Sequence, residues 1–226
     1  MRALISFTIL SGIKIFARLF YRFDVNWLTK EEDSWDEIRL IVFLNHTSLF
    51  EPLYVGVPPW PFIAKLSRKM VAPGADKTLN RPIVGKFWKF MGPGMISISR
   101  KRDRTWKSFM EAIKNRSIII IAPEGRMKRA NGLDLNGNPM TVKSGVADVL
   151  EQLYEGKMLV AYSGGLHHVQ VPGQKFPNFF KRLKMNLELL DIQDYKAAFN
   201  GEGVAWKRAV VADMQERLEN NCPKAY

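Results

Sequence analysis

A histidine and a carboxylate that could act together as a general base lie in the first quarter of the chain. His46 follows the apolar run 40–44 after a single residue, Asn45, and Glu51 lies five positions further along. The end of a strand presents such a histidine at the rim of a sheet, where open α/β folds usually build their sites. A nearby carboxylate would hold the tautomer of the ring and stabilise its protonated form. Because the chain has three histidines in all, His46 is the leading candidate for a catalytic base.

The same run also has a purely structural interpretation. Ser48-x-x-Glu51 is a capping box, in which Ser48 would bond a free backbone amide and Glu51 would reach back to the cap. Five residues correspond to about 500° of helical rotation, so His46 and Glu51 cannot share one face of a regular helix. The two side chains can meet only if His46 lies outside the helix and Glu51 lies in its first turns. The spacing alone leaves both interpretations open.

Composition bounds the partners of this chain. With 226 residues, of which 46% are hydrophobic, it can form one domain with a full core, or one domain with an appendage. A formal net charge of +12 favours an acidic partner: nucleic acid, an anionic membrane, a phosphorylated substrate or an acidic carrier protein. The single cysteine, Cys222, excludes a disulfide framework within the chain and a cysteine metal site, which is typical of a reducing compartment.

The N-terminal segment is almost wholly apolar but is interrupted by Lys14 and Arg18. Its uncharged part, 3–13, is shorter than the roughly 20 residues that a spanning helix needs, and no signal-peptide cleavage site follows it. At helical spacing the two cations share a stripe with Ser11 and Arg22. This pattern predicts a helix that lies in a membrane interface with its basic stripe toward anionic headgroups. A core helix of the same domain is the alternative.

The rest of the chain alternates strand-like and helical segments, which predicts an α/β fold with a mostly parallel central sheet flanked by helices. Strands are expected at 38–44, 62–65, 95–99, 118–122 and 158–162. Helices are expected at 48–55, over most of 66–91, at 103–114, from near Ser144, and after 195, with a loop at 27–37. We expect residues 1–30 to form the membrane-associating helix and a linker, and residues 31–226 to form the main domain.

Three of these strands are followed by polar residues, which a parallel sheet would bring to one edge. They are the 46–51 segment, Arg100 at the end of 95–99, and the loop that begins at Glu124. Arg100 opens a basic run whose other members are expected to form a solvated or membrane-facing surface. Glu124 could be a simple turn residue, but the 125–129 segment offers a glycine amide and two arginines that would suit a phosphate.

Four short motifs occur in order between residues 35 and 170: Asn45-His46-x-Ser48-x-x-Glu51, Gly94-x-Ile96-x-Ile98-x-Arg100, Pro123-Glu124-Gly125 with the later Val142-Lys143-x-Gly145, and Val160-Ala161-Tyr162. Together they resemble the glycerolipid acyltransferase family, which includes the 1-acylglycerol-3-phosphate acyltransferases. The first three resemble its His-x4-Asp, second and third motifs, and the last matches its fourth motif only in outline. The segment 62–65 also resembles the family segment that carries a basic residue, here Lys65, near the acceptor phosphate.

The chain departs from the family pattern at two places. Glu51 stands where the family usually has aspartate, and its side chain is one methylene longer. The third motif commonly reads Pro-Glu-Gly-Thr-Arg, whereas Arg126 and Met127 follow Gly125 here, so that Arg126 or Arg129 would stand in for the family arginine. The resemblance therefore specifies the chemistry more closely than the acceptor headgroup.

The resemblance implies transfer of a fatty acyl chain from acyl-CoA or acyl carrier protein to a hydroxyl of a lysolipid. The default acceptor is 1-acylglycerol-3-phosphate, and no cofactor or metal is implied. His46 would be the general base and Glu51 would orient it. The implied substrate-binding residues are Lys65, Arg100, Glu124, Gly125, Arg126 and Arg129. The enzyme would be peripheral or monotopic on the cytoplasmic face of an anionic membrane.

Other functions stay open at this point. A non-catalytic lipid-binding protein would use the basic surface and the N-terminal helix for binding only, and an acyltransferase could act on another lysophospholipid, an amino-acid lipid or a glycolipid. An RNA-binding protein would explain the charge through phosphate contacts, but the sequence has no recognisable nucleic-acid module, so no such partner is expected. His167 and His168 would point to opposite faces of a strand and are interpreted as structural. The aromatic segment 176–180 is either a further membrane contact or a packed loop.

Overall fold

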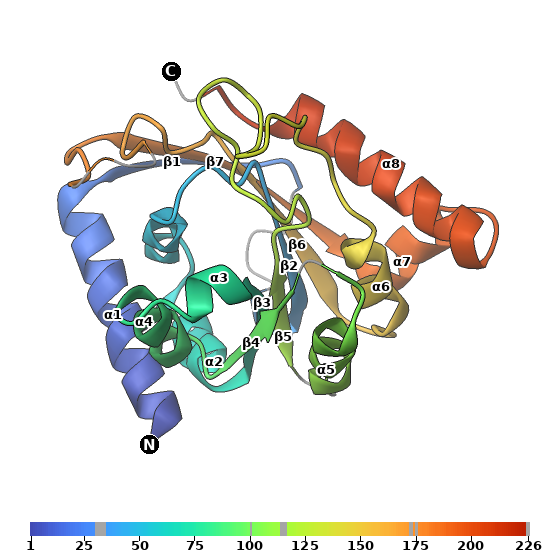
Figure 1. Ribbon diagram of the computed structural model, residues 1–226, viewed down its shortest axis with the longest axis horizontal. Coiled ribbons are helices and arrows are strands. Elements are labelled where there is room, and N and C mark those ends of the chain that lie inside the picture. Colours follow the sequence, from blue (N-terminus) through green and yellow to red (C-terminus); the bar gives the residue numbers. More distant parts are fainter. Residues whose placement is uncertain (30–34, 100, 114–116, 172–173, 175, 225–226) are drawn as a thin grey trace.

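The computed structural model describes residues 1–29, 35–99, 101–113, 117–171, 174 and 176–224 (Figure 1). These residues form a seven-stranded sheet in the order β1-β7-β6-β2-β5-β3-β4. The strands are β1 (Arg22–Trp27), β2 (Ile38–Leu44), β3 (Met70–Ala75), β4 (Gly94–Ile98), β5 (Ile118–Ile121), β6 (Lys157–Ser163) and β7 (Arg182–Asp191). Neighbouring strands are parallel except β6 and β7. The predicted mostly parallel α/β sheet is confirmed.

Helices cover both faces of this sheet, as Figure 1 shows. Those on one side are α1 (Arg2–Phe20), α2 (Trp60–Lys69), α3 (Asp76–Leu79) and α4 (Val84–Met91), and those on the other are α5 (Arg104–Ala112), α6 (Gly145–Glu151), α7 (Ile192–Ala197) and α8 (Gly203–Asn221). Two 3₁₀ helices, η1 (Trp35–Glu37) and η2 (Glu51–Gly56), flank β2. Each face has its own buried hydrophobic cluster, so the central strands are apolar on both sides.

The expected strand at 62–65 is wrong, because these residues lie within α2. Pro61 occupies the first turn of this helix, where its missing N–H costs nothing. Phe62, Ile63 and Leu66 are buried on one helical face. The neighbouring segment Met70–Ala75, expected to be the end of a helix broken near Pro73-Gly74, is instead β3 between β4 and β5. A short apolar run such as this one fits a buried strand or a buried helix equally well.

Besides β3, two strands were not predicted. β7 has a period-2 pattern in which Leu183, Met185, Leu187 and Leu189 are buried, and this alternation is visible in the sequence. β1 lies between the N-terminal helix and the expected loop, and it pairs in parallel with β7. Part of the segment expected as a linker therefore belongs to the sheet.

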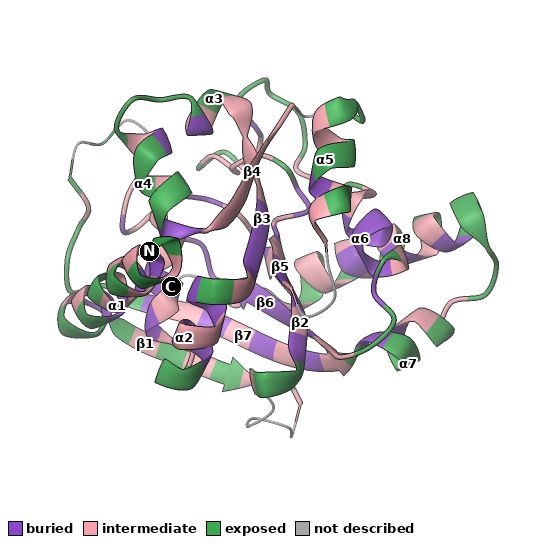
Figure 2. Cartoon of the chain, turned by 90° about the horizontal axis from the view of Figure 1, so that it is seen from below, coloured by how far each residue is buried: buried purple, intermediate pink, exposed green. Residues whose placement is uncertain are grey.

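The N-terminal helix α1 is present, but its orientation is the reverse of the predicted one. The Lys14 ammonium is buried and donates to the carbonyl oxygens of Gly56 at 3.0 Å and Pro58 at 2.6 Å. Apolar residues of α1 face outward instead: Leu4 and Leu19 are each 69% exposed. Figure 2 shows that α1 carries both exposed and less exposed residues along its length. Carbonyl oxygens at the end of η2 have no partner within that helix and bind the cations of α1. Lys14 of the predicted basic stripe therefore faces the protein and not the headgroups, whereas Arg18 and Arg22 are exposed.

By length and composition, α1 is the one helix in the described part of the chain that could cross a membrane. Its inner face packs on η2, α2 and α4. The helix is thus apolar on the outside and attached to the domain on the inside, which is the arrangement of a helix that lies along a surface.

Candidate active site

The backbone turns sharply where β2 ends. Asn45 adopts a φ of 65°, in the left-handed region that asparagine tolerates better than most residues. Its side-chain amide donates to the carbonyl oxygen of Ser163 at 2.8 Å, at the end of the neighbouring strand β6. This turn carries His46 out of the strand and over the edge of the sheet.

His46 is held at its backbone as well as at its ring. Its N–H donates to Glu124 Oε2 at 2.7 Å, and its carbonyl oxygen accepts the N–H of Lys128 at 2.7 Å. Glu124 Oε1 also accepts the N–H of Asn45 at 2.8 Å. Glu124, which follows β5, is 3% exposed. It therefore clamps the turn that bears the histidine.

Glu51 joins the ring of His46 to the same turn. Its Oε2 pairs with His46 Nδ1, while its Oε1 accepts the backbone N–H of Thr47 at 2.6 Å and of Ser48 at 3.2 Å. Glu51 is the first residue of η2, whereas His46 lies outside the helix. The predicted capping box does not form, because the N-cap of η2 is Phe50 and has no side-chain cap hydrogen bond; of the two interpretations, the structure shows the carboxylate that holds the imidazole.

The electrostatics of the pair suit proton transfer. Burial lowers the pKa of His46. The charge and hydrogen bond of Glu51, together with the charge of Glu124, raise this pKa by more than burial lowers it, so the net shift is upward. Burial raises the pKa of Glu124 despite its two backbone hydrogen bonds. An ionised carboxylate only accepts hydrogen bonds, so Glu51 favours the proton on Nδ1 and leaves Nε2 as a proton acceptor.

A cavity of about 750 Å³ extends from this pair along the α1 face of the sheet. Its inner wall is apolar and includes Leu10 of α1, Phe62 and Leu66 of α2, Met91 of α4, Leu159 and Ala161 of β6 and Leu187 of β7. Its polar end contains His46, Glu51, Glu124, Gly125 and the basic residues Lys101, Arg102, Arg126 and Lys143. A long apolar space that ends at polar, titratable groups is the form of a site for an aliphatic ligand with a polar end.

Comparison with known proteins identifies the family. A family model described as Acyltransferase matches residues 27–165, which is more than half of the chain. The chain belongs to the acyltransferase family. No curated protein sequence matches it. Among solved structures, its fold is similar to that of PlsC, the 1-acyl-sn-glycerophosphate (LPA) acyltransferase of Thermotoga maritima, with a TM-score of 0.53, 20% identity and coverage of 95% of this chain and 81% of that one. At that identity the likeness concerns the fold.

Arg126 is positioned in this acyltransferase by a buried aspartate. Its Nη1 lies 2.9 Å from Asp134 Oδ2, and Asp134 is 6% exposed. Backbone N–H donation from Asn138 and Asn136 is the main cause that lowers the pKa of Asp134. A second, polar cavity of about 460 Å³ lies along this loop and shares Glu124, Arg126 and Lys143 with the first. The long loop after Gly125 thus forms a basic rim beside the histidine.

The structure does not bring every predicted binding residue to the cavity. The Lys65 ammonium donates to the carbonyl oxygen of Asp36, before β2 begins, whereas His46 follows the end of β2. Seven residues of strand separate these ends by roughly 20 Å. The prediction for Lys65 came from the resemblance of segment 62–65 to a family segment near the acceptor phosphate, and α2 places this side chain elsewhere.

The remaining predicted residues have mixed outcomes. Gly125 lines the cavity, but its N–H donates to the carbonyl of Ala122 at 3.0 Å and is not available to an anion. Arg129 forms a backbone turn with Leu133 and is not among the described residues that line the cavity. Arg100 lies outside the described residues.

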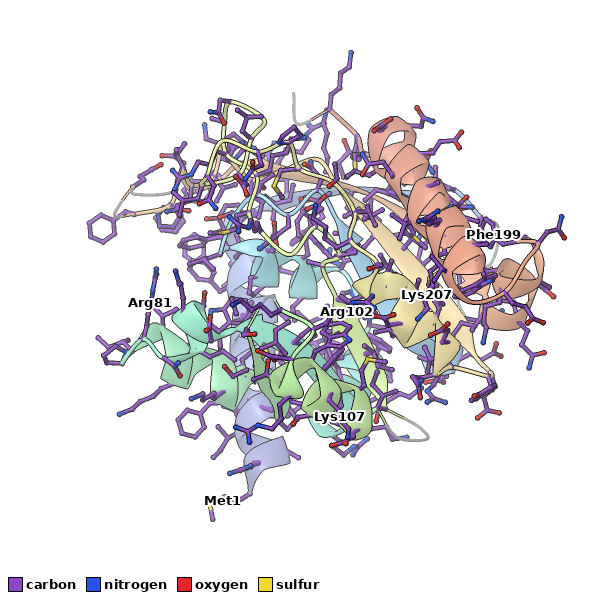
Figure 3. All side chains as sticks on the ribbon, turned by 45° about the vertical axis from the view of Figure 1, so that its right-hand side comes forward. Met1, Arg81, Arg102, Lys107, Phe199 and Lys207 are labelled. Carbon is purple, nitrogen blue, oxygen red and sulfur yellow. The ribbon has the colours of Figure 1, made fainter. Side chains whose placement is uncertain are left out.

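Three basic residues at the cavity mouth were not predicted as site residues. Lys101 and Arg102 were expected to be plain surface, and Lys143 was noted only as part of a motif. Arg102 donates to Ser144 and pairs with Asp148 at 2.6 Å, and Lys207 pairs with the same carboxylate (Figure 3). The basic run after β4 was visible in the sequence and could have indicated Lys101 and Arg102 as site residues. The sequence does not show, however, that this run lies against α6 and the loop before it. Among the described residues, no group of three or more His, Cys, Asp or Glu side chains could hold a metal ion.

Proposed function

We propose that this protein is a membrane-associated O-acyltransferase that moves a fatty acyl chain from a thioester, acyl-CoA or acyl carrier protein, to the free hydroxyl of a lysolipid. The proposed acceptor is 1-acylglycerol-3-phosphate, which would give phosphatidic acid. The observation that carries the proposal is the opening of the His46–Glu51 pair into a long apolar cavity with a basic rim. The acyltransferase family of the chain and its PlsC-like fold support it.

In the proposed reaction, His46 Nε2 takes the proton of the acceptor hydroxyl as that oxygen attacks the thioester carbonyl. Glu51 holds the ring and stabilises the imidazolium that forms. When the tetrahedral intermediate collapses, the C–S bond breaks and the proton passes from His46 to the departing thiolate. Positioned base catalysis contributes about 10²–10⁴-fold, so alignment of the two substrates must supply much of the remaining acceleration.

The cavity would receive the acyl chain of the donor. Its inner wall is formed by side chains that carry no charge, and burial of each methylene from water stabilises the bound chain by about 0.8 kcal/mol. The polar end then places the thioester carbonyl beside His46. This assignment accounts for a cavity that reaches as far as α1 and α2.

The basic rim would hold the acceptor headgroup. Arg126 and Lys143 line both cavities, and Lys101 lines the first. A planar guanidinium can bind two phosphate oxygens at once, which favours Arg126 as the main contact. Glu124, by contrast, is committed to the backbone of Asn45 and His46. Its proposed role is to position the base.

The outer surface of α1 would lie on the cytoplasmic face of a membrane. Two other segments with exposed apolar residues lie beside α1, because Ser6 donates to the carbonyl of Met91 in α4 and Phe180 donates its N–H to the carbonyl of Phe20. The exposed apolar side chains are Leu4, Ile15 and Leu19 on α1, Ile83, Phe87 and Phe90 at α4, and Phe176, Phe179 and Phe180. An exposed apolar surface on a chain of net charge +12 suits an anionic bilayer.

The test incubates the purified protein with acyl-CoA or acyl carrier protein donors and a panel of lysolipids, with products identified by mass spectrometry. His46→Ala should abolish the diacyl product, whereas His168→Ala, a histidine that binds the carbonyl of Arg182, is the matched control. Full turnover by His46→Ala would refute the assignment. Tight binding to anionic vesicles without any product would favour a non-catalytic lipid-binding protein or an acceptor outside the panel.

A further inference from the structure

The two cations of α1 bind the end of the 3₁₀ helix that begins with Glu51. Lys14 Nζ donates to the carbonyls of Gly56 and Pro58, and Arg18 Nε donates to the same Gly56 carbonyl at 2.7 Å. Lys14 is 6% exposed, so these bonds are made away from water. A buried lysine keeps its charge only where such acceptors hold it, and here both acceptors lie at one junction.

η2 is short and is fixed at both ends. Glu51 is its first residue and Gly56 its last, and its turns are closed by N–H donation from Leu53 to Phe50 at 2.9 Å and from Val57 to Tyr54 at 2.9 Å. A displacement of the Gly56 end is therefore transmitted to Glu51 through one rigid turn and a half. Because the backbone N–H groups of Thr47 and Ser48 donate to Glu51, the displacement would also move the turn that contains His46.

The contact has little freedom to move. A Cβ atom on Gly56 would lie 2.4 Å from the Phe23 ring, so the backbone of η2 packs directly on β1. The Arg18 guanidinium lies over the same ring, 5.2 Å from its centroid, and the Lys14 ammonium lies 5.4 Å from the centroid of Trp60. Both cations thus contact an aromatic ring as well as the carbonyl oxygens, although Arg18 is exposed and Lys14 is buried.

We propose that Lys14 and Arg18 are positioning residues of the acyltransferase, which hold η2 so that Glu51 meets the ring of His46. The proposal rests on the proposed function, in which the His46–Glu51 pair performs the base chemistry. It makes α1 part of the catalytic machinery, since its outer face lies on lipid while its inner face supports the catalytic carboxylate. Deletion of the charge at position 14 should loosen the pair, although Lys14 is not itself one of the residues that line the cavity.

The decisive variant is Lys14→Met, which keeps the length of the side chain and removes its donors. Its kcat should fall 10- to 100-fold with KM within about twofold, because misplacement by about 1 Å can cost ~10²-fold. Lys14→Arg, which restores donors, should recover most of the loss. Lys107→Met makes the same substitution on a side chain that is 77% exposed, and serves as the control.

A pH profile separates positioning from a general loss of folded protein. Glu51 and Glu124 are the charged groups that face His46, and both raise the pKa of its ring. If Lys14→Met weakens contact with Glu51, the acid limb of kcat/KM should move to lower pH. If the substitution only lowers the fraction of folded protein, kcat/KM should fall by the same factor at every pH and the acid limb should stay at its original pH. Unchanged kcat together with an unmoved limb in Lys14→Met would overturn the proposal.

A second measurement does not depend on turnover. NMR titration of the His46 ring, assigned with His167→Gln and His168→Gln variants, should show a lower pKa in Lys14→Met than in the unmodified protein. Arg18→Met should shift it in the same direction and replaces Lys14→Met if that protein does not fold. Equal His46 pKa values in the unmodified protein and the variants would refute the proposal. If the protein transfers no acyl chain at all, the proposed function fails while this titration still decides the positioning role.

Discussion

Glu51→Gln tests the central pair because the carboxylate has two sets of donors to satisfy. In the present structure Oε2 pairs with His46 Nδ1, and Oε1 accepts two backbone N–H groups, those of Thr47 and Ser48. A glutamine has only one oxygen for these two places. It must turn its NH₂ either toward the backbone amides or toward the imidazole.

Each orientation has a definite cost. With the oxygen on His46, the NH₂ faces two amide donors, and an unsatisfied buried group costs about 1–3 kcal/mol. With the NH₂ on His46, Nδ1 must accept, so the proton moves to Nε2 and the ring cannot take a proton from the acceptor. In either orientation the imidazolium loses its counter-charge. Because one decade of rate corresponds to about 1.36 kcal/mol, the loss of most of the 10²–10⁴-fold contribution of the base raises the barrier by roughly 2.7–5.5 kcal/mol.

The assay is steady-state acyl transfer over a range of pH, with Glu111→Gln as the control, since Glu111 is 65% exposed on α5. We expect kcat to fall about 10²–10⁴-fold. The charge and hydrogen bond of Glu51 raise the pKa of His46. Since the active base is the neutral ring, their removal should move the acid limb of the profile to lower pH. A kcat within fivefold of the unmodified enzyme, with the limb in its original place, would refute the reasoning.

Three further predictions concern the clamp, the cavity and the surface. Glu124→Gln leaves one of two backbone amides without an acceptor, so denaturant titration should show a free energy of unfolding lower by about 1–3 kcal/mol, with a lower kcat. Ala161→Leu adds three carbons to the cavity wall, and competition between donors should shift preference to shorter acyl chains without the loss of stability that overpacking of a filled core would cause. Leu19→Ser removes a side chain that is 69% exposed on α1, and vesicle co-sedimentation should show a 5- to 30-fold lower partition coefficient, equivalent to about 1–2 kcal/mol. An unchanged free energy of unfolding in Glu124→Gln would contradict the first prediction. An unchanged preference for acyl-chain length in Ala161→Leu would contradict the second, and an unchanged partition coefficient in Leu19→Ser would contradict the third.

The pattern of the sequence was sufficient for four of the seven strands, β2, β4, β5 and β6, and for the place of His46 just after β2. β2 and the other central strands are apolar on both faces, and such runs predict buried parallel strands. The sequence analysis expected His46 and Glu124 to lie close together, because the parallel strands that precede them end at the same edge of the sheet. The sequence analysis also required Glu51 to lie in the first turn of a helix and His46 outside it, which the geometry of η2 confirms.

The errors have a common physical cause, which is that short segments take their structure from tertiary contacts. Residues 62–65 carry no strong local preference, and the prolines before them start a helix whose buried face packs under the sheet. The stripe of Lys14 and Arg18 was correctly located on one side of α1. Its direction, however, depends on carbonyl groups more than 35 residues away, at Gly56 and Pro58. Composition alone cannot tell whether a cation meets a headgroup or a backbone carbonyl.

The length of the residue at position 51 also has a structural reason, and it yields a last prediction. The carboxylate of Glu51 bridges the imidazole and the backbone amides of its own turn, and an aspartate would withdraw it by about 1.5 Å, the length of one C–C bond. Glu51→Asp can then keep one set of partners only. If it stays on the amides, kcat should fall while the free energy of unfolding changes little. If it stays on His46, the amides lose their acceptor and unfolding becomes easier by about 1–3 kcal/mol. Parallel measurement of kcat and of denaturant unfolding distinguishes the two, and a variant unchanged in both would show that the bridge is not required.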